Sequence, residues 1–306
     1  MLIAFVHSGK SFLPEMEAYT NYFTAMGFQC EVTHPRGLHK LQPAVAWHFM
    51  GIDRQKKQEG VFTIHEYVSA STPPAPKLKN NVKRILSVQP DHRIFQNDYV
   101  KTSLNFKDDI PCSYRDMGIP AGWLEPLEEE KEFDFIYTGE LWKRGLERVL
   151  HAFGYGALKG HSLLIVSHEY KQISEGLKDV KNIIFKGPVP HEQVRTLIHQ
   201  SRYALNIMPD AEPFNRQTST KLLEYCACKV PVISSDYEWV RNFEQQNSGK
   251  FFYLNDGLAN FTWDNISKFH YDFPDLHNWT WEQQIERSGI PAMLMQKFPE
   301  LKTANS

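Results

Sequence analysis

Short apolar runs alternate with longer amphipathic segments along the whole chain. A short apolar run between turn residues is typical of a strand that is buried in a parallel sheet. Apolar positions spaced three and four apart are typical of a helix that covers one face of such a sheet. The alternation therefore predicts an α/β fold in which helices connect parallel strands.

The first half of the chain contains one complete series of these elements. Strands are expected at residues 2–7, 29–33, 45–49, 61–65 and 92–95, and helices at residues 14–26 and 77–86. Gly27 directly follows the first helix, which is the usual place for a glycine that ends a helix. A segment rich in proline and charge, residues 109–131, is typical of a connection between two domains.

The pattern restarts after this connection. Strands are expected at residues 133–138, 162–167, 181–185, 203–208, 231–234 and 251–254, and helices at residues 143–154, 191–200, 218–227 and 237–246. Two such series without sequence repetition predict two Rossmann-like, doubly wound domains that face each other across a cleft. We expect the first domain at residues 1–124 and the second at 125–306, with one late helix at 279–298 that could pack back on the first.

The overall composition excludes several classes of protein. A chain of 306 residues with 42% hydrophobic residues can form two domains, and a net charge of −2 does not favour a nucleic-acid partner. The four cysteines lack zinc-binding spacing and are expected to be reduced thiols. No basic segment accompanies the first apolar run, and no run approaches the roughly 18 apolar residues of a membrane span. We therefore expect a cytoplasmic protein that is at most peripheral at the inner face of a membrane.

The segment richest in candidate chemistry follows the strand predicted at residues 203–208. Hydroxyl residues at 218–220 open the next helix, where capped amides and the helix dipole favour an anion such as a diphosphate. Lys221 lies in the first turn, where the dipole disfavours a cation unless a phosphate lies between them. Glu224 lies one turn further on the same face and could accept hydrogen bonds from two ribose hydroxyls. The alternative is a capped helix that carries a solvated Lys221–Glu224 pair.

This segment resembles a known family. Ser219-Thr-Lys-Leu-Leu-Glu-Tyr225, followed by Pro231-Val-Ile-Ser234, is similar to the donor-site signature of the retaining GT-B glycosyltransferases of family 4. In that family the helix start binds the donor diphosphate, and the residue that matches Glu224 binds the ribose. The resemblance assigns the following positions of this segment to the nucleotide sugar: Arg216, Ser219, Thr220, Lys221, Leu222 and Glu224.

Two elements upstream resemble the same family. Phe135-Ile-Tyr-Thr-Gly139, with Lys143-Arg-Gly145 after it, is similar to the strand–glycine–loop–helix element whose basic side chain meets the phosphates. Lys143 and Arg144 could each supply that side chain. Ile184-Phe-Lys-Gly187-Pro-Val189 resembles the turn beside the nucleobase, which implies contacts from Gly187 and Val189. The resemblance covers residues 133–255 with the spacing kept.

Two positions depart from the family pattern. The family carries a second glutamate eight positions before the ribose glutamate, near the donor sugar, but Arg216 occupies this position and the nearest carboxylate is Glu212. The family also has an arginine shortly after the strand glycine, whereas Glu140 follows Gly139 here. Both departures leave the nucleotide half of the site intact and leave the sugar half open.

The first domain carries a weaker resemblance. His65 ends the strand Phe62-Thr-Ile-His65 and is similar to the family's histidine under the donor sugar, although the backbone alone could satisfy a histidine at a strand end. Gly9 follows the first strand, where the family has a loop of small residues that touches the sugar and phosphate. A glycine there allows close approach of the backbone, and an ordinary turn is the alternative.

Motifs of other chemistries are missing from the sequence. It has no Gly-x-Gly-x-x-Gly, no phosphate-binding Gly-x-x-x-x-Gly-Lys and no Gly-x-Ser-x-Gly run. No Asp-x-Asp occurs, and no His-x-x-x-His pair has a carboxylate partner, so no metal site is expected.

The resemblance implies an enzyme that moves a hexosyl group from a UDP- or GDP-linked sugar to a hydroxyl of a glycan or lipid-linked acceptor. It further implies retention, no metal and no resident cofactor, in the assembly of bacterial surface polysaccharide or lipopolysaccharide. Lys143 or Arg144, together with Lys221, would stabilise the departing diphosphate, and His65 would hold the sugar. Two alternatives stay open: a sugar-nucleotide 2-epimerase, and a nucleotide-sugar-binding subunit that supports a partner transferase.

Overall fold

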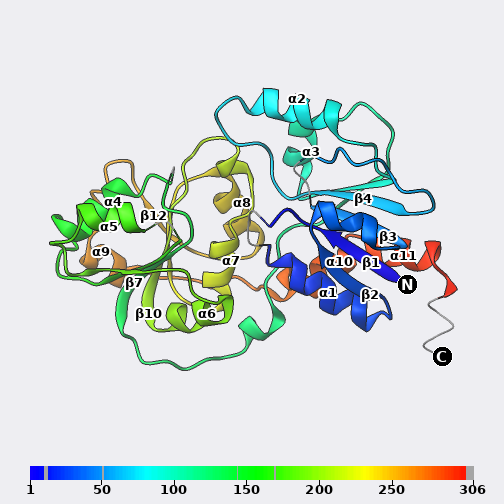
Figure 1. Cartoon of the computed structure of the whole chain (residues 1–306). Helices are drawn as coiled ribbons and strands as arrows, with labels where there is room; N and C mark the ends of the chain where they lie inside the picture. The colour runs from blue at the N-terminus through cyan, green and yellow to red at the C-terminus, as the bar shows by residue number, and fades with distance from the viewer. Residues whose placement is uncertain (10–12, 50–51, 143, 169, 301–306) are drawn as a thin grey trace. The chain divides into compact units, whose positions relative to one another are not determined.

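The computed structural model describes residues 1–9, 13–49, 52–142, 144–168 and 170–300 (Figure 1). Its contacts divide the chain into two compact units, Met1–Pro120 with Trp279–Ser306, and Ala121–Asn278. The division after residue 120 lies close to the expected one after residue 124. Residues 279–306, expected in the second domain, group with the first unit.

The first unit is built on a parallel sheet of six strands in the order β2-β1-β3-β4-β5-β6. The strands are β1 (Leu2–Val6), β2 (Gln29–Thr33), β3 (Val45–Phe49), β4 (Phe62–Tyr67), β5 (His92–Phe95) and β6 (Cys112–Tyr114). The helices are α1 (Glu15–Ala25), α2 (Pro76–Leu86), α3 (Asp98–Leu104), α10 (Trp281–Arg287) and α11 (Ile290–Lys297), with a 3-10 helix η1 (Pro35–Lys40). Since all pairs are parallel, the carboxyl ends of these strands share one edge.

The core of the first unit combines residues from both ends of the chain. Phe5, Phe23 and Trp47 are fully buried beside the sheet. The last two helices add Ile285, Ile290 and Leu294 to the same cluster, and Figure 1 shows α10 and α11 beside β1 and β3. These final helices therefore complete the first core.

The second unit has another parallel sheet of six strands, in the order β12-β11-β10-β7-β8-β9. The strands are β7 (Phe133–Thr138), β8 (Leu163–Val166), β9 (Ile183–Lys186), β10 (Ser201–Asn206), β11 (Val232–Ser235) and β12 (Phe252–Leu254). The helices are α4 (Glu147–Gly154), α5 (Lys171–Gly176), α6 (His191–His199), α7 (Thr220–Ala227), α8 (Glu238–Gln246) and α9 (Trp263–Lys268). Short 3-10 helices lie at η2 (Ala121–Leu124), η3 (Phe214–Arg216) and η4 (His277–Trp279).

The predicted α/β fold with two Rossmann-like sheets is confirmed, and every predicted strand is present. The pattern did not predict β6, α3, α5 and α9, because segments this short do not establish a period. The single helix expected at 279–298 was wrong, since two helices meet at Gly289, whose φ of 69° lies in the left-handed region. Among the described residues, the helices include none with the length and hydropathy needed to cross a bilayer.

Candidate functional site

Helix α7 begins at the carboxyl edge of the second sheet, after the loop that follows β10. Ser219 occupies the N-cap position, but its side chain accepts no hydrogen bond from the helix amides. Its hydroxyl instead donates to Asn206 Oδ1 at 2.9 Å, and Asn206 Nδ2 donates to Ser234 Oγ and Tyr237 Oη. The expectation that the Ser219 hydroxyl caps the helix was therefore wrong, because Asn206 at the end of β10 holds that hydroxyl. Thr220, the first residue of α7, is partly exposed.

Lys221 lies in the first turn of α7 and is held by neutral oxygen atoms. Its Nζ donates to Tyr137 Oη at 3.0 Å and to the Ile207 carbonyl at 3.3 Å, and it lies 4.2 Å from the centre of the Tyr137 ring. Burial, reinforced by the positive charge of Arg144, lowers the pKa of Lys221 well below its usual value. A bound anion at this position would oppose this shift and favour the charged ammonium.

Arg144 lies in the loop between β7 and α4 and contributes to the electrostatics around Lys221. Its Nη2 donates to Glu140 Oε2 at 2.9 Å, and its guanidinium lies 4.7 Å from the centre of the Phe214 ring. The loop turns through two glycines with positive φ, Gly139 at 106° and Gly145 at 75°. The structure thus brings Arg144 together with Lys221, while Lys143 lies outside the described residues.

Glu224 is 8% exposed and is held by a residue that the sequence did not indicate. His191, the first residue of α6, donates from Nε2 to Glu224 Oε1 at 2.9 Å. The His191 ring stacks on Trp123 with centroids 4.8 Å apart. His191 follows Val189 by two positions, so the predicted nucleobase turn lies close to the predicted ribose carboxylate. The one sequence signal for His191 is its position at the start of a helix after this turn.

The remaining predicted residues of the second unit differ in their burial and in the groups that they contact. A Cβ added at Gly187 would lie 3.2 Å from the Tyr170 ring, so the backbone packs closely there. Leu222 is fully buried in the core, and only its backbone could contact a ligand. Arg216 Nε lies 3.1 Å from Glu238 Oε1, an exposed pair at the position where the family carries a glutamate.

In the first unit, His65 lies on β4 and is fully buried. Its Nε2 lies 3.3 Å from Asp53 Oδ2, and His48 Nδ1 on β3 lies 3.5 Å from the same oxygen. Burial lowers the pKa of His48 to about 4 and also lowers the pKa of His65, so both rings are neutral at pH 7. The partner of His65 is therefore a carboxylate and not the backbone.

The same three side chains carry the ligand types of a divalent metal. Their ligand atoms lie within 4.8 Å of one another, although the linear spacing of the histidines gave no metal signal. Parallel pairing of β3 with β4 sets His48 beside His65. However, within the described part of the chain His65 Nδ1 is buried without a hydrogen-bond partner, whereas a metal-bound imidazole normally donates its second N–H to an acceptor. We therefore interpret the group as a hydrogen-bonded cluster that fixes His65.

Gly9 lies beyond the end of β1 with φ at 72°, and no atom of the described residues would lie within 4 Å of a Cβ there. Its amide donates to His7 Nδ1 at 3.3 Å. The backbone at Gly9 is thus open to close approach, and the chain that follows at residues 10–12 lies outside the described residues.

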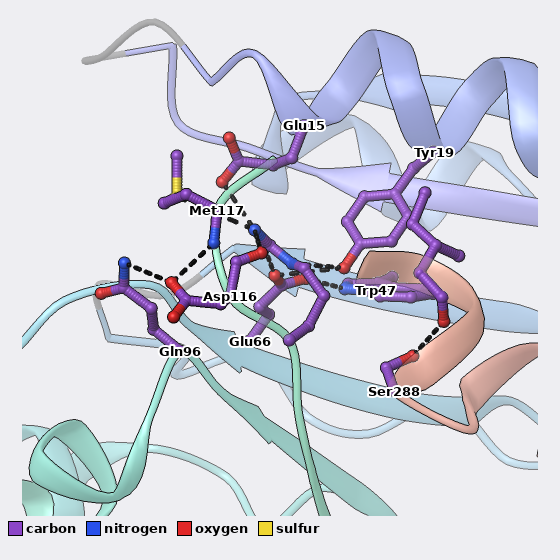
Figure 2. Close-up of polar contacts among 10 residues, drawn as sticks. Glu15, Tyr19, Trp47, Glu66, Gln96, Asp116, Met117 and Ser288 are labelled. Atoms are coloured by element: carbon purple, nitrogen blue, oxygen red, sulfur yellow. Dashed lines mark hydrogen bonds and ion pairs between the residues drawn. The ribbon is translucent and has the colours of Figure 1, made fainter. Parts of the chain in front are cut away.

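A buried ion cluster lies on the other face of the first sheet, and the sequence did not predict it (Figure 2). Arg115 donates to Glu66 and lies 3.5 Å from Glu15 Oε1 at the start of α1. Glu66 also accepts hydrogen bonds from Trp47 at 2.7 Å and from Tyr19 at 3.2 Å. Burial raises the pKa of Glu66, although the Arg115 charge opposes this shift. The cluster therefore ties α1 and β4 to the segment that follows β6.

A comparison with family models matches residues 132–261 to the family described as Glycosyl transferases group 1. No curated protein matches the chain in sequence. The matched residues contain β7, the loop of Arg144, the turn of Gly187 and the whole of α7.

Several solved structures share the fold over nearly the whole chain. Sucrose-phosphate synthase from Thermosynechococcus elongatus is 12% identical, with a TM-score of 0.63 over 100% of both chains. HepE of Anabaena in complex with UDP-glucose is 11% identical, with a TM-score of 0.58 over 97% of this chain and 95% of that one. UDP-GlcNAc 2-epimerase from Methanocaldococcus jannaschii is 12% identical, with a TM-score of 0.52 over 97% and 100%. At these identities the likeness concerns the fold, which is GT-B.

Proposed function

We propose that this glycosyltransferase of the GT-B fold, whose second unit carries a glycosyl transferases group 1 domain, takes its hexosyl group from a UDP- or GDP-linked sugar. The acceptor in this proposal is a hydroxyl of a glycan or of a lipid-linked intermediate. One observation carries the proposal: Lys221, Arg144 and Glu224 converge where α7 begins, at the carboxyl edge of the second sheet. The complex of HepE with UDP-glucose supports this donor class.

The positive groups at the start of α7 would bind and stabilise the donor diphosphate. The first amides of α7 and the helix dipole favour an anion, and Lys221 and Arg144 add two cationic side chains beside them. Charge accumulates on the diphosphate as the bond to the sugar breaks. Preorganised donors that meet this charge lower the barrier, which is usually the largest contribution in such reactions.

Glu224 would hold the ribose through hydrogen bonds to its hydroxyls. His191 and Trp123 fix the carboxylate from behind, since His191 donates to Oε1 and Trp123 stacks on the imidazole. A carboxylate held in this way loses little freedom when a ligand binds. The turn at Gly187 and Val189 would then lie against the nucleobase.

Retention and metal independence belong to the same proposal, as do a cytoplasmic location and a role in bacterial surface polysaccharide assembly. Arg144, and Lys221 once a diphosphate favours its charged form, would supply the positive charge that a metal would otherwise provide to the diphosphate. We expect transfer to continue in the presence of excess EDTA. The anomeric configuration of the product, determined by NMR, should equal that of the donor sugar.

Calorimetry with UDP, GDP and their sugars tests the nucleotide site. We expect Glu224→Ala to weaken binding roughly 10- to 100-fold, since hydrogen bonds to a charged group contribute about 1.5–3 kcal/mol each. Glu192→Ala, an exposed neighbour on α6, is the matched control and should bind as the unaltered protein does. Unchanged affinity of the Glu224 variant for every nucleoside diphosphate would exclude the assignment.

A nucleotide-sugar-binding subunit remains the second candidate, because Arg216 pairs with Glu238 where the family carries a glutamate. The isolated protein, given donor and acceptor, should release free nucleoside diphosphate if it is a transferase. Binding of the donor without release in any combination would favour the supporting subunit. Conversion of UDP-GlcNAc to its 2-epimer without acceptor would favour the epimerase.

A further inference from the structure

Helix α2 of the first unit turns its apolar side chains to solvent. Leu78 is 64% exposed, Ile85 is 73% exposed and Leu86 is 42% exposed. Together with Val82 these residues occupy one side of the helix, because they are spaced three and four positions apart. An outward apolar stripe on a single helix is unusual for a side of a protein that faces only water.

The side of α2 that faces the protein is polar. Asn80 is buried and donates to the Ser103 carbonyl at 2.9 Å, and Arg84 donates to the Asn105 carbonyl at 3.0 Å. Helix α8 of the second unit shows the ordinary orientation, since its Val240 and Phe243 are buried. The orientation of α2 is thus the reverse of that expected for a helix that packs on a sheet.

The charged residues on α2 itself are all basic. Lys77, Lys79, Lys83 and Arg84 lie on α2, and no aspartate or glutamate occurs between Glu66 and Asp91. A basic helix with exposed leucine and isoleucine side chains has the chemistry of a helix that lies in the plane of a membrane surface. Lysines at the border of such a stripe can place their stems along the apolar phase and their ammonium groups among lipid phosphates.

We propose that α2 docks on the surface of an anionic lipid bilayer. The apolar stripe of Leu78, Val82, Ile85 and Leu86 enters the boundary between headgroups and acyl chains, and Lys77 and Lys79 contact the phosphates. With 11 residues, α2 is long enough to lie in this boundary and too short to cross a bilayer.

Docking through α2 would also bring the carboxyl edge of the first sheet close to a lipid-linked acceptor. The helix follows β4 after residues 68–75, so the segment that leads to it leaves the carboxyl edge of the sheet, where His65 and Gly9 lie. Docking would hold this edge near the headgroups, where a lipid-linked acceptor is found. Only this consequence rests on the proposed function; the docking itself does not.

Cosedimentation with vesicles tests the proposal on the full chain. The protein should bind vesicles of phosphatidylglycerol and phosphatidylcholine, bind vesicles of phosphatidylcholine alone much more weakly, and detach at high salt. We expect Lys77→Gln with Lys79→Gln to weaken partitioning roughly 25-fold, or about fivefold per lysine. Leu78→Ser with Ile85→Ser should weaken it at least about tenfold.

Matched control variants remove two lysine charges, or one exposed aromatic side chain, from the surface of the second unit. Lys178→Gln with Lys181→Gln, and separately Tyr155→Ser, should leave vesicle binding unchanged. Circular dichroism and donor affinity should be unaltered in all four variants, since every changed side chain is exposed. Equal vesicle binding by the α2 variants and the unaltered protein would overturn the proposal. A dimer in sedimentation velocity that the Leu78 and Ile85 changes abolish, without any vesicle binding, would assign the stripe to a second copy instead.

Discussion

The ionisation of Lys221 connects a single side chain to ligand binding. Its pKa is held well below the usual value by burial and by Arg144, and no carboxylate pairs with its Nζ among the described hydrogen bonds. A donor diphosphate placed beside it should raise that pKa again, so binding should take up a proton. Calorimetry of UDP-glucose and GDP-mannose between pH 7 and 9, in buffers of different ionisation enthalpy, measures this uptake.

The Lys221→Met variant should bind the donor without this proton uptake. Lys178→Met, which changes an exposed lysine of the same unit, should retain it. Binding that is independent of buffer for the unaltered protein at every pH would show that Lys221 does not meet the diphosphate.

Glu140 competes with the ligand for Arg144. Its carboxylate is about half-exposed and accepts a hydrogen bond from Arg144 at 2.9 Å, in the loop where the family has an arginine shortly after the strand glycine. Replacing it with glutamine frees the guanidinium, and an exposed pair of this kind contributes about 0.2–1 kcal/mol. We therefore expect Glu140→Gln to strengthen donor binding roughly two- to fivefold by calorimetry. Glu147→Gln in the first turn of α4 is the control, and an equal gain in both would indicate a general effect of charge.

At the scale of single residues, the sequence identified groups that lie within one segment and missed groups that come together from distant segments. Lys221 and Glu224 could be predicted because one helical turn separates them. His191 lies 33 positions before Glu224, and Asp53 lies 12 before His65, and neither belongs to a motif. Their roles depend on strand order and side-chain packing, which no local pattern contains.

At the scale of elements, the cluster of Arg115, Glu66 and Glu15 connects three segments and sets two carboxyl groups against one guanidinium. Glu15 Oε2 is buried and has no hydrogen-bond partner among the described residues. Arg115 is fully buried between the two carboxyl groups. The two ends of the cluster should therefore respond to substitution in different ways.

Arg115→Met should lower the free energy of unfolding by about 3–5 kcal/mol, because it leaves buried carboxylates without a cation. Glu15→Gln should change it by no more than about 1 kcal/mol, and could raise it, because it removes a buried charge that Arg115 only partly compensates. Urea denaturation measures both values. A larger loss for Glu15→Gln than for Arg115→Met would contradict this description of the cluster.

Long elements could be predicted because they repeat a period several times, while short ones could not. Helix α3 has seven residues, and its start depends on the Asn97 side chain, which accepts a hydrogen bond from the Val100 amide. The division of the late helix depends on Gly289, followed by Pro291 in the first turn of α11. A single glycine in an amphipathic segment does not reveal whether its φ is positive, so the pattern predicted one helix.

At the scale of the whole molecule, neutral buried histidines make stability depend on pH. The pKa of His48 and that of His199 are both lowered to about 4 by burial, and that of His65 is lowered too. When the pKa of a histidine is lower in the folded protein than the ordinary 6.5, its contribution to folding stability is complete above pH 6.5. As the pH falls toward 4, the unfolded chain binds a proton that the folded protein does not bind, and this contribution is lost. The free energy of unfolding should therefore fall over this range, by up to about 1.4 kcal/mol per pH unit for each histidine.

Urea denaturation at a series of pH values measures this slope. His48→Asn should lower the slope by about one bound proton, while His39→Asn, at an exposed histidine, should leave the slope unchanged. A free energy of unfolding that is constant between pH 6.5 and 4 would show that these histidines have the same pKa in the folded and unfolded states.

The two-sheet architecture could be predicted from the sequence because the strand–helix alternation restarts near residue 133. The packing of the C-terminal helices on the first sheet could not be predicted in the same way. An amphipathic pattern shows that a helix has a buried side, but it does not show which sheet covers that side. Ile285, Ile290 and Leu294 pack with residues of β1 and β3, more than 200 positions earlier in the chain.

This return makes the second unit an insertion within the first, with consequences for synthesis on the ribosome. Residues 121–278 are contiguous and can fold as soon as they have emerged, as domains generally do. Residues 1–120 are translated first, but their apolar cluster is complete only after α10 and α11, the last helices to be translated, have emerged. A nascent chain stalled before residue 279 would therefore hold a finished second unit beside an unfinished first one, whose uncovered apolar residues are the kind of surface that chaperones bind.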